Sequence, residues 1–98
     1  MPYRKILANN LLAFRKLENV SQEEISFRTE ISKYTIILIE REKTNVRLDV
    51  LEKLASYTGF TISELFTENY VKETLGAGMT KWRTGLLRKN YHTEKLWQ

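Results

Sequence analysis

The chain has 98 residues, of which 42% are hydrophobic and 29% are charged, and its formal net charge is +4. This length suits one domain with a modest core. The absence of cysteine excludes a disulfide framework and a thiolate metal site. No apolar run approaches the roughly 18 residues of a membrane span, and the opening MPYRKILANN lacks a signal peptide's apolar stretch. We therefore expect a cytoplasmic protein that does not use a membrane.

Positive charge is concentrated at the C-terminal end. Residues 1–78 contain eleven basic and eleven acidic residues, whereas residues 79–98 contain five basic residues and one acidic residue. A basic tail favours an anionic partner, and nucleic acid is the first candidate. The alternative is a solvated, partly disordered end without a partner.

Apolar residues recur with a helical period from the start of the chain. Leu7, Leu11 and Phe14 are spaced i, i+4, i+7, which predicts an amphipathic helix. Asn19 suits a left-handed stop. Ser21 and Glu24 then have the spacing of a capping box, which predicts that a second, short helix begins there.

Four large apolar residues follow one another in SKYTIILIEREK, residues 32–43. A buried strand could hide such a run, whereas a helix must turn part of it outward. We favour a helix because Ser32 can cap it and the neighbouring segments are helical. Ile36 and Ile39 then face the core, and Ile37 and Leu38 face outward. The strand remains the alternative.

Two further helical segments follow, and the fold class that we expect is all-α. Leucines at positions 48, 51 and 54 mark one helix, and Thr61 with Glu64 forms a second capping-box pattern. LGAGM, residues 75–79, resembles a linker. The five predicted helices span residues 4–18, 22–29, 33–43, 48–58 and 62–68. The expected core comprises Leu7, Leu11, Phe14, Ile25, Ile36, Ile39, Leu48, Leu51 and Leu65.

A short helix, a tight turn and a second helix are the layout of helix-turn-helix DNA binders. Residues 7–66 resemble the phage-repressor type of this motif, the XRE family, in SQEEIS, ISKYTI, IEREK and GFTISELF. The resemblance implies a five-helix DNA-binding domain over residues 1–68. It does not extend to residues 67–98. We treat residues 69–98 as a basic extension.

The resemblance also implies roles for individual residues. Gln22 matches a position that hydrogen-bonds DNA phosphate at a helix N-terminus. Lys33, Tyr34 and Leu38 match positions that read base edges, and Ile37 lies on the same side. Positions that contact the DNA backbone after the recognition helix are matched by Arg41, Lys43, Asn45 and Arg47. A buried ion pair between the first and third helices is matched by Arg15 and Glu40.

Four positions depart from the family pattern. Glu30, in the turn, and Glu42, after the recognition helix, stand where glycine is usual, although glutamate tolerates a positive φ poorly. Thr29 stands where an apolar core residue is usual, and Val46 stands where a proline often follows the asparagine.

Charge and apolarity keep a second function open. Residues 22–43 contain four basic and five acidic residues, so this segment alone supplies little of the phosphate neutralisation on which DNA affinity depends. Ile37 and Leu38 can contact thymine methyls, but an exposed apolar pair also suits a protein surface. The favoured function is a dimeric, repressor-like transcriptional regulator that binds double-stranded DNA. The alternative is an interaction module, of antitoxin or antirepressor type, that binds a protein partner.

Catalysis and metal binding find no support in the sequence. His92 is the sole histidine and has no second ligand in view, so we expect no metal and no cofactor. No nucleophile–base set is present, and we do not expect an enzyme. In the tail, Met79, Trp82 and Leu86 recur at helical spacing. They predict a helix over about 79–90 that packs, forms a dimer contact or lies near the DNA backbone.

Overall fold

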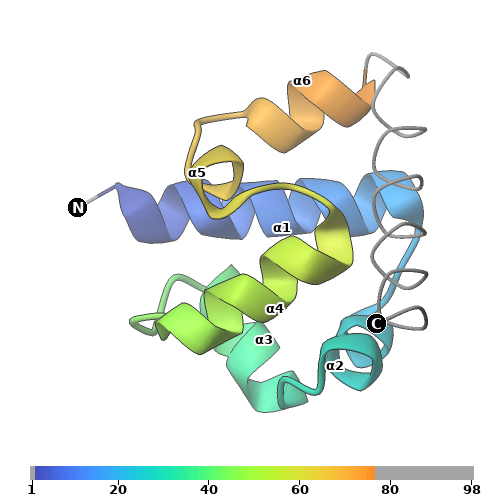
Figure 1. Cartoon of the computed structure of the whole chain (residues 1–98), viewed down its shortest axis with the longest axis vertical. Helices are drawn as coiled ribbons and strands as arrows, with labels where there is room; N and C mark the ends of the chain where they lie inside the picture. Colours follow the sequence, from blue (N-terminus) through green and yellow to red (C-terminus); the bar gives the residue numbers. More distant parts are fainter. Residues whose placement is uncertain (1, 77–98) are drawn as a thin grey trace, which may run out of the picture.

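The computed structural model describes residues 2–76, which fold entirely into helices and the loops between them. Helix α1 lies between α6 on one side and α3 on the other, while α2, α4 and α5 complete the domain (Figure 1). The all-α expectation is therefore confirmed, and each of the five expected helices is present. The helices are α1 Tyr3–Glu18, α2 Gln22–Thr29, α3 Lys33–Glu40, α4 Leu48–Thr58, α5 Ile62–Leu65 and α6 Tyr70–Gly76.

Side chains mark the starts of α2 and α5, and a left-handed residue marks the end of α1, where the sequence predicts them. The hydroxyl of Ser21 accepts a hydrogen bond from the Glu24 amide at 3.0 Å, and α2 begins there. The reciprocal capping box is complete at α5, where Thr61 and Glu64 bond each other's backbone amides. Helix α1 ends at Asn19, whose φ is 57°. These bonds satisfy amide groups that a helix terminus leaves unpaired.

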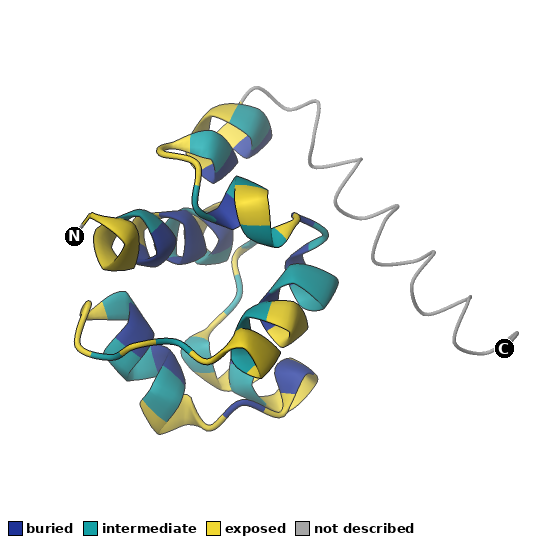
Figure 2. Ribbon diagram, turned by 60° about the vertical axis from the view of Figure 1, so that its left-hand side comes forward, coloured by how far each residue is buried: buried dark blue, intermediate teal, exposed yellow. Residues whose placement is uncertain are grey.

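The core is one cluster of apolar side chains enclosed by the helices, with exposed outer faces (Figure 2). Eight of the nine expected core residues belong to this cluster or pack against it. Leu48 is the exception, since 65% of it is exposed. It is the first residue of α4, and the helix turns inward only from Val50 onward. The buried apolar cluster consists of Leu7, Leu11, Phe14, Ile25, Ile31, Ile36, Ile39, Leu54, Phe60, Leu65, Val71 and Leu75.

Two helices end earlier than predicted. Helix α3 stops at Glu40 rather than near residue 43. Glu42 adopts a left-handed φ of 61°, and the Lys43 amide donates back to the Leu38 carbonyl at 2.9 Å. This six-residue closure is the hydrogen bond of a Schellman motif, which terminates a helix. Helix α5 stops at Leu65 rather than near residue 68, and a turn through Asn69, φ 59°, follows it.

A sixth helix, α6, was not expected. Val71 and Leu75 are buried, so the LGAGM segment begins inside a helix rather than as a linker. Asn10 of α1 holds this region in place. Its amide donates to the Leu65 carbonyl at 2.7 Å and the Thr67 carbonyl at 3.0 Å, and its carbonyl accepts from the Val71 amide at 3.2 Å. Helix α6 thus shares the core of the helices before it. The predicted helix at 79–90, with Met79, Trp82, Leu86 and also His92, lies outside the described residues.

Candidate nucleic-acid interface

The turn between α2 and α3 is fixed by side-chain bonds to the backbone. The Thr29 hydroxyl donates to the Ile25 carbonyl at 2.6 Å and accepts from the Ile31 amide at 3.2 Å. The Ser26 hydroxyl donates to the Ile31 carbonyl at 2.6 Å. Thr29 is buried, and its hydroxyl bonds explain how a polar residue replaces an apolar one there. Glu30 takes the left-handed conformation that this turn requires, with φ 61°.

The N-terminal end of α3 presents Lys33 and Tyr34 to solvent. Ser32 caps the helix by accepting from the Thr35 amide at 3.1 Å, so both side chains follow immediately after the cap. Tyr34 is 70% exposed. The Lys33 amine lies 3.1 Å from the Glu23 carboxylate, which belongs to the first turn of α2. That amine holds the pKa of Glu23 below its ordinary value of 4.5, first through their hydrogen bond and then through its charge.

The outward apolar pair is less exposed than expected. Ile36 and Ile39 are buried as predicted, but Ile37 and Leu38 are half-buried rather than fully outward. The larger exposed apolar side chain of the motif is Phe27 on α2, at 81%. Sequence reasoning missed it, although its position two residues after buried Ile25 places it on the opposite side of a helix.

A three-residue network joins α1, α2 and α3 beneath this surface. Glu40 accepts from Arg15 at two positions, Nε at 2.6 Å and Nη2 at 3.0 Å. The Gln22 amide donates to the same carboxylate at 2.8 Å. An amide nitrogen carries two hydrogens, so Gln22 keeps one N–H for a second acceptor. The network thereby fixes the orientation of the first residue of α2.

The loop between α3 and α4 carries the four remaining predicted contacts, all exposed. Asn45 accepts a hydrogen bond from Arg4 at the start of α1. The Arg47 Nε lies 3.3 Å from the Asp49 carboxylate. Within the described part of the chain, Arg41 and Lys43 form no ion pair. Among the predicted DNA contacts, Arg41 and Lys43 are therefore the two cations that pair with no carboxylate of residues 2–76.

The predicted contacts all lie between residues 22 and 47, on α2, α3 and the loop after α3. The Lys33 amine lies beside Glu23 at the start of α2, and the loop of residues 41–47 follows the end of α3. Charge is balanced over residues 2–76, which contain equal numbers of basic and acidic residues.

Among these residues no group of three histidine, cysteine or acidic side chains is arranged to hold a metal. None of the described helices is long and apolar enough to cross a membrane.

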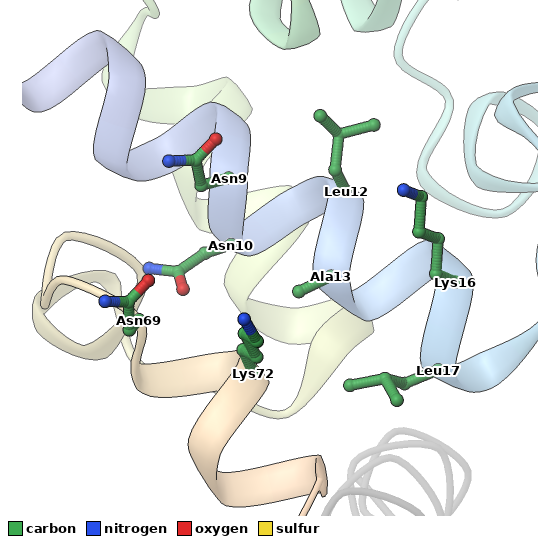
Figure 3. Close-up of a pocket in the computed structure, with 8 residues that line it drawn as sticks. All are labelled: Asn9, Asn10, Leu12, Ala13, Lys16, Leu17, Asn69 and Lys72. Carbon is green, nitrogen blue, oxygen red and sulfur yellow. The ribbon is translucent and has the colours of Figure 1, made fainter.

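A groove of about 450 Å³ lies elsewhere, between α1 and α6 (Figure 3). Helix α1 lies between α6 and α3 (Figure 1). Each of the two helices contributes one lysine, Lys16 and Lys72, and the rest of the lining is amide and aliphatic. The groove includes none of the predicted DNA contacts, so it is a separate feature. Its lining residues are Asn9, Asn10, Leu12, Ala13, Lys16, Leu17, Asn69 and Lys72.

Comparison with known proteins identifies the class. Residues 11–65 match the helix-turn-helix family. The chain is 30% identical over 76 residues to the control protein C.SmaI of Serratia marcescens. This match covers 78% of this chain and 90% of that protein. It is 33% identical over 60 residues to an uncharacterised HTH-type transcriptional regulator of Methanocaldococcus jannaschii, over 61% of this chain and 91% of the relative. No match was found among solved structures.

The chain belongs to the helix-turn-helix family of XRE type. The structure shows this motif in two features. Side-chain hydrogen bonds hold the turn between α2 and α3, and the start of α3 is exposed.

Proposed function

We propose that this protein is a sequence-specific transcriptional regulator that binds a short duplex operator as a homodimer in the cytoplasm. The observation that carries the proposal is the rigid turn that projects the exposed Lys33 and Tyr34 from the first turn of α3. A helix presented in this way can enter the major groove with its N-terminal residues against base edges. The proposal includes no catalytic residue and no cofactor.

Base readout is assigned to α3. The Lys33 amine can donate to guanine N7 or O6, and the Tyr34 hydroxyl can donate or accept at a base edge or a phosphate. Ile37 and Leu38 are half-buried, so each offers part of its side chain to a thymine methyl. These apolar contacts would select for thymine without a hydrogen bond.

Phosphate contacts are assigned to α2 and to the loop after α3. Gln22 is the first residue of α2 and is held by Glu40, so its free N–H and the helix N-terminus would face a phosphate together. Arg41 and Lys43 supply unpaired positive charge, and Asn45 and Arg47 follow in the same exposed loop. Such contacts position a protein on the duplex and set its salt dependence.

We assign two roles to the tail, residues 79–98. One is attraction to the duplex, which the balanced charge of residues 2–76 does not supply, and the other is contact with a second copy. The tail carries the whole net charge of +4, so it would provide the general attraction to the duplex. Met79, Trp82 and Leu86 would pack against a second copy, which suits a motif that reads two half-sites.

A second candidate function is an interaction module that binds a protein. The observation that favours it is the large exposed aromatic surface of Phe27 on a motif without net positive charge. Exposed apolar surface is more often a contact for another protein. The half-burial of Ile37 and Leu38 reduces the apolar area that α3 itself could offer.

A gel-shift series with the purified full chain and the DNA upstream of its own gene separates the two functions. At about 50 mM salt we expect binding to that duplex at lower protein concentration than to a random-sequence duplex, and weakening of both as salt rises. Lys43→Ala should weaken binding to both duplexes alike, and the slope of log affinity against log salt concentration should become shallower by about one. Absence of any shift at low salt, together with capture of a protein that Phe27→Ser releases, would establish the second function instead.

A further inference from the structure

The Glu23–Lys33 ion pair joins the two helices of the motif at the predicted reading surface. The amine lies 3.1 Å from the carboxylate, and both side chains are largely exposed. Glu23 is the second residue of α2 and Lys33 is the first residue of α3, so the pair crosses the turn. The turn itself is fixed by the bonds of Ser26 and Thr29, which hold the last turns of α2 against the segment that leads into α3. The lowered pKa of Glu23 agrees with this contact.

The pair changes what Lys33 can do near a duplex. A lysine amine has three donors, and Glu23 uses one of them. With its charge balanced, Lys33 adds little to the counterion release that drives non-specific binding. For the amine to reach a phosphate, it must leave Glu23 or bring a carboxylate close to the negatively charged backbone. At a base edge it can keep Glu23 and donate a second hydrogen.

We infer that Glu23 is a specificity-determining residue, because it withholds Lys33 from phosphates and leaves the amine for the acceptors of guanine in the major groove. This inference rests on the proposed function. Guanine N7 and O6 are neutral acceptors, so the amine can bond them without losing its carboxylate partner. Glu23 therefore lowers affinity for any sequence, and lowers it least where guanine meets Lys33. The consequence is a larger ratio of specific to non-specific binding.

Glu24 provides a matched control for Glu23. It is the neighbouring acid in the first turn of α2, is also exposed, and pairs with Arg28 at 3.7 Å rather than with Lys33. Glu23→Gln and Glu24→Gln make the same change in charge one residue apart. Only the first substitution releases Lys33. A Glu23→Gln/Lys33→Met double variant then tests whether any effect acts through the lysine.

The experiment uses the full chain and two duplexes of equal length. One is enriched by the wild-type chain from a random pool, and the other has random sequence. Glu23→Gln should bind the random duplex about fivefold more tightly at low salt, with a salt slope steeper by about one. Binding to the enriched duplex should change less, so the specificity ratio falls. Pools enriched by Glu23→Gln should show weaker selection for guanine at one position in each half-site.

Two results would overturn the inference while leaving the proposed function intact. One is an equal effect of Glu23→Gln and Glu24→Gln on both duplexes. The other is a Glu23→Gln effect that persists undiminished when Lys33→Met is also present. If the wild-type chain enriches no duplex at any salt, the proposed function itself fails and the inference falls with it. Thermal melts of all variants should stay close to that of the wild type, since an exposed ion pair contributes little to stability.

Discussion

Arg15 of α1 and Glu40 of α3 form a bidentate ion pair, with Nε to Oε2 at 2.6 Å and Nη2 to Oε1 at 3.0 Å. The Glu40 side chain is only 6% exposed and that of Arg15 is 21% exposed. The same carboxylate holds Gln22 at 2.8 Å. The pair therefore couples the packing of the first and third helices to the position of a residue that we assign to phosphate binding.

Removing one partner of this pair should destabilise the domain strongly. Arg15→Met leaves the Glu40 carboxylate buried without its cation, which should cost about 3 kcal/mol of unfolding free energy. Urea melts of Arg15→Met and Glu40→Gln measure it. The control is Arg28→Met, which breaks the exposed pair with Glu24 and should change stability by about 0.5 kcal/mol or less. Losses below about 1 kcal/mol in both Arg15→Met and Glu40→Gln would rule out this role.

Asn10 should be as important as a core leucine, although it is polar. Its side chain bonds the Leu65 and Thr67 carbonyls and the Val71 amide. Asn10→Ala leaves these groups without their partner and should cost about 3 kcal/mol. Asn9→Ala is the matched control, because Asn9 is the exposed neighbour on the same helix, and it should change stability by less than about 0.5 kcal/mol. Equal thermal melts for the two alanine variants would contradict the assignment.

Glycine should stabilise the two left-handed glutamate positions. Glu30 and Glu42 both have φ 61°, a conformation that costs a side-chain-bearing residue about 1–2 kcal/mol. Glycine avoids that cost but loses more chain entropy on folding. We expect Glu30→Gly and Glu42→Gly each to stabilise the domain by about 0.5 kcal/mol. Glu52→Gly, at an exposed position inside α4, should instead destabilise it by about 1 kcal/mol. A loss of stability at both left-handed positions would refute the strain argument.

Acid should weaken the contact between α2 and α3 at Glu23. Because Lys33 lowers the Glu23 pKa below 4.5 in the folded protein, the folded state binds this proton less readily than the unfolded state. The stabilisation is present above pH 4.5 and is lost as pH falls through the lowered pKa. Carboxyl-carbon NMR titration should show Glu23 titrating below 4.5, and closer to 4.5 in Lys33→Met. Lys43→Met should leave the titration unchanged. Identical curves for the wild type and Lys33→Met would remove the contact from the account.

The five expected helices and most of the core could be predicted because spacing and capping residues determine them locally. Ser32 and the surrounding helices were enough to prefer a helix over a strand for residues 36–39. Leu48 was misplaced because periodicity does not show where along a helix its contact with the core begins. The apolar residues Val71 and Leu75 did not predict α6, since a four-residue spacing over one turn is a weak signal. Helix α6 forms against α1, where the Asn10 carbonyl accepts a hydrogen bond from the Val71 amide.

For the candidate interface, the residues could be predicted but their contacts could not. The family resemblance supplied the residues of α3 and the loop, but it gave no information on their partners. The contacts of Lys33 with Glu23 and of Asn45 with Arg4 depend on how the chain folds back. Phe27 was not predicted, because a single aromatic residue gives a weaker signal than the longer apolar run in α3. A helical projection of α2 would have placed it outward.

The central claim, that the start of α3 reads duplex DNA, is tested most directly by following backbone amide NMR signals of the full chain during titration with a duplex. The duplex is the one that the wild-type chain enriches from a random pool. The account predicts the largest shifts at Gln22, at residues 33–38 and in the loop 41–47, with little change at Asn9 and Lys72 on the α1–α6 groove. Shifts concentrated on that groove, or absent from residues 33–38 while the duplex is bound, would contradict it.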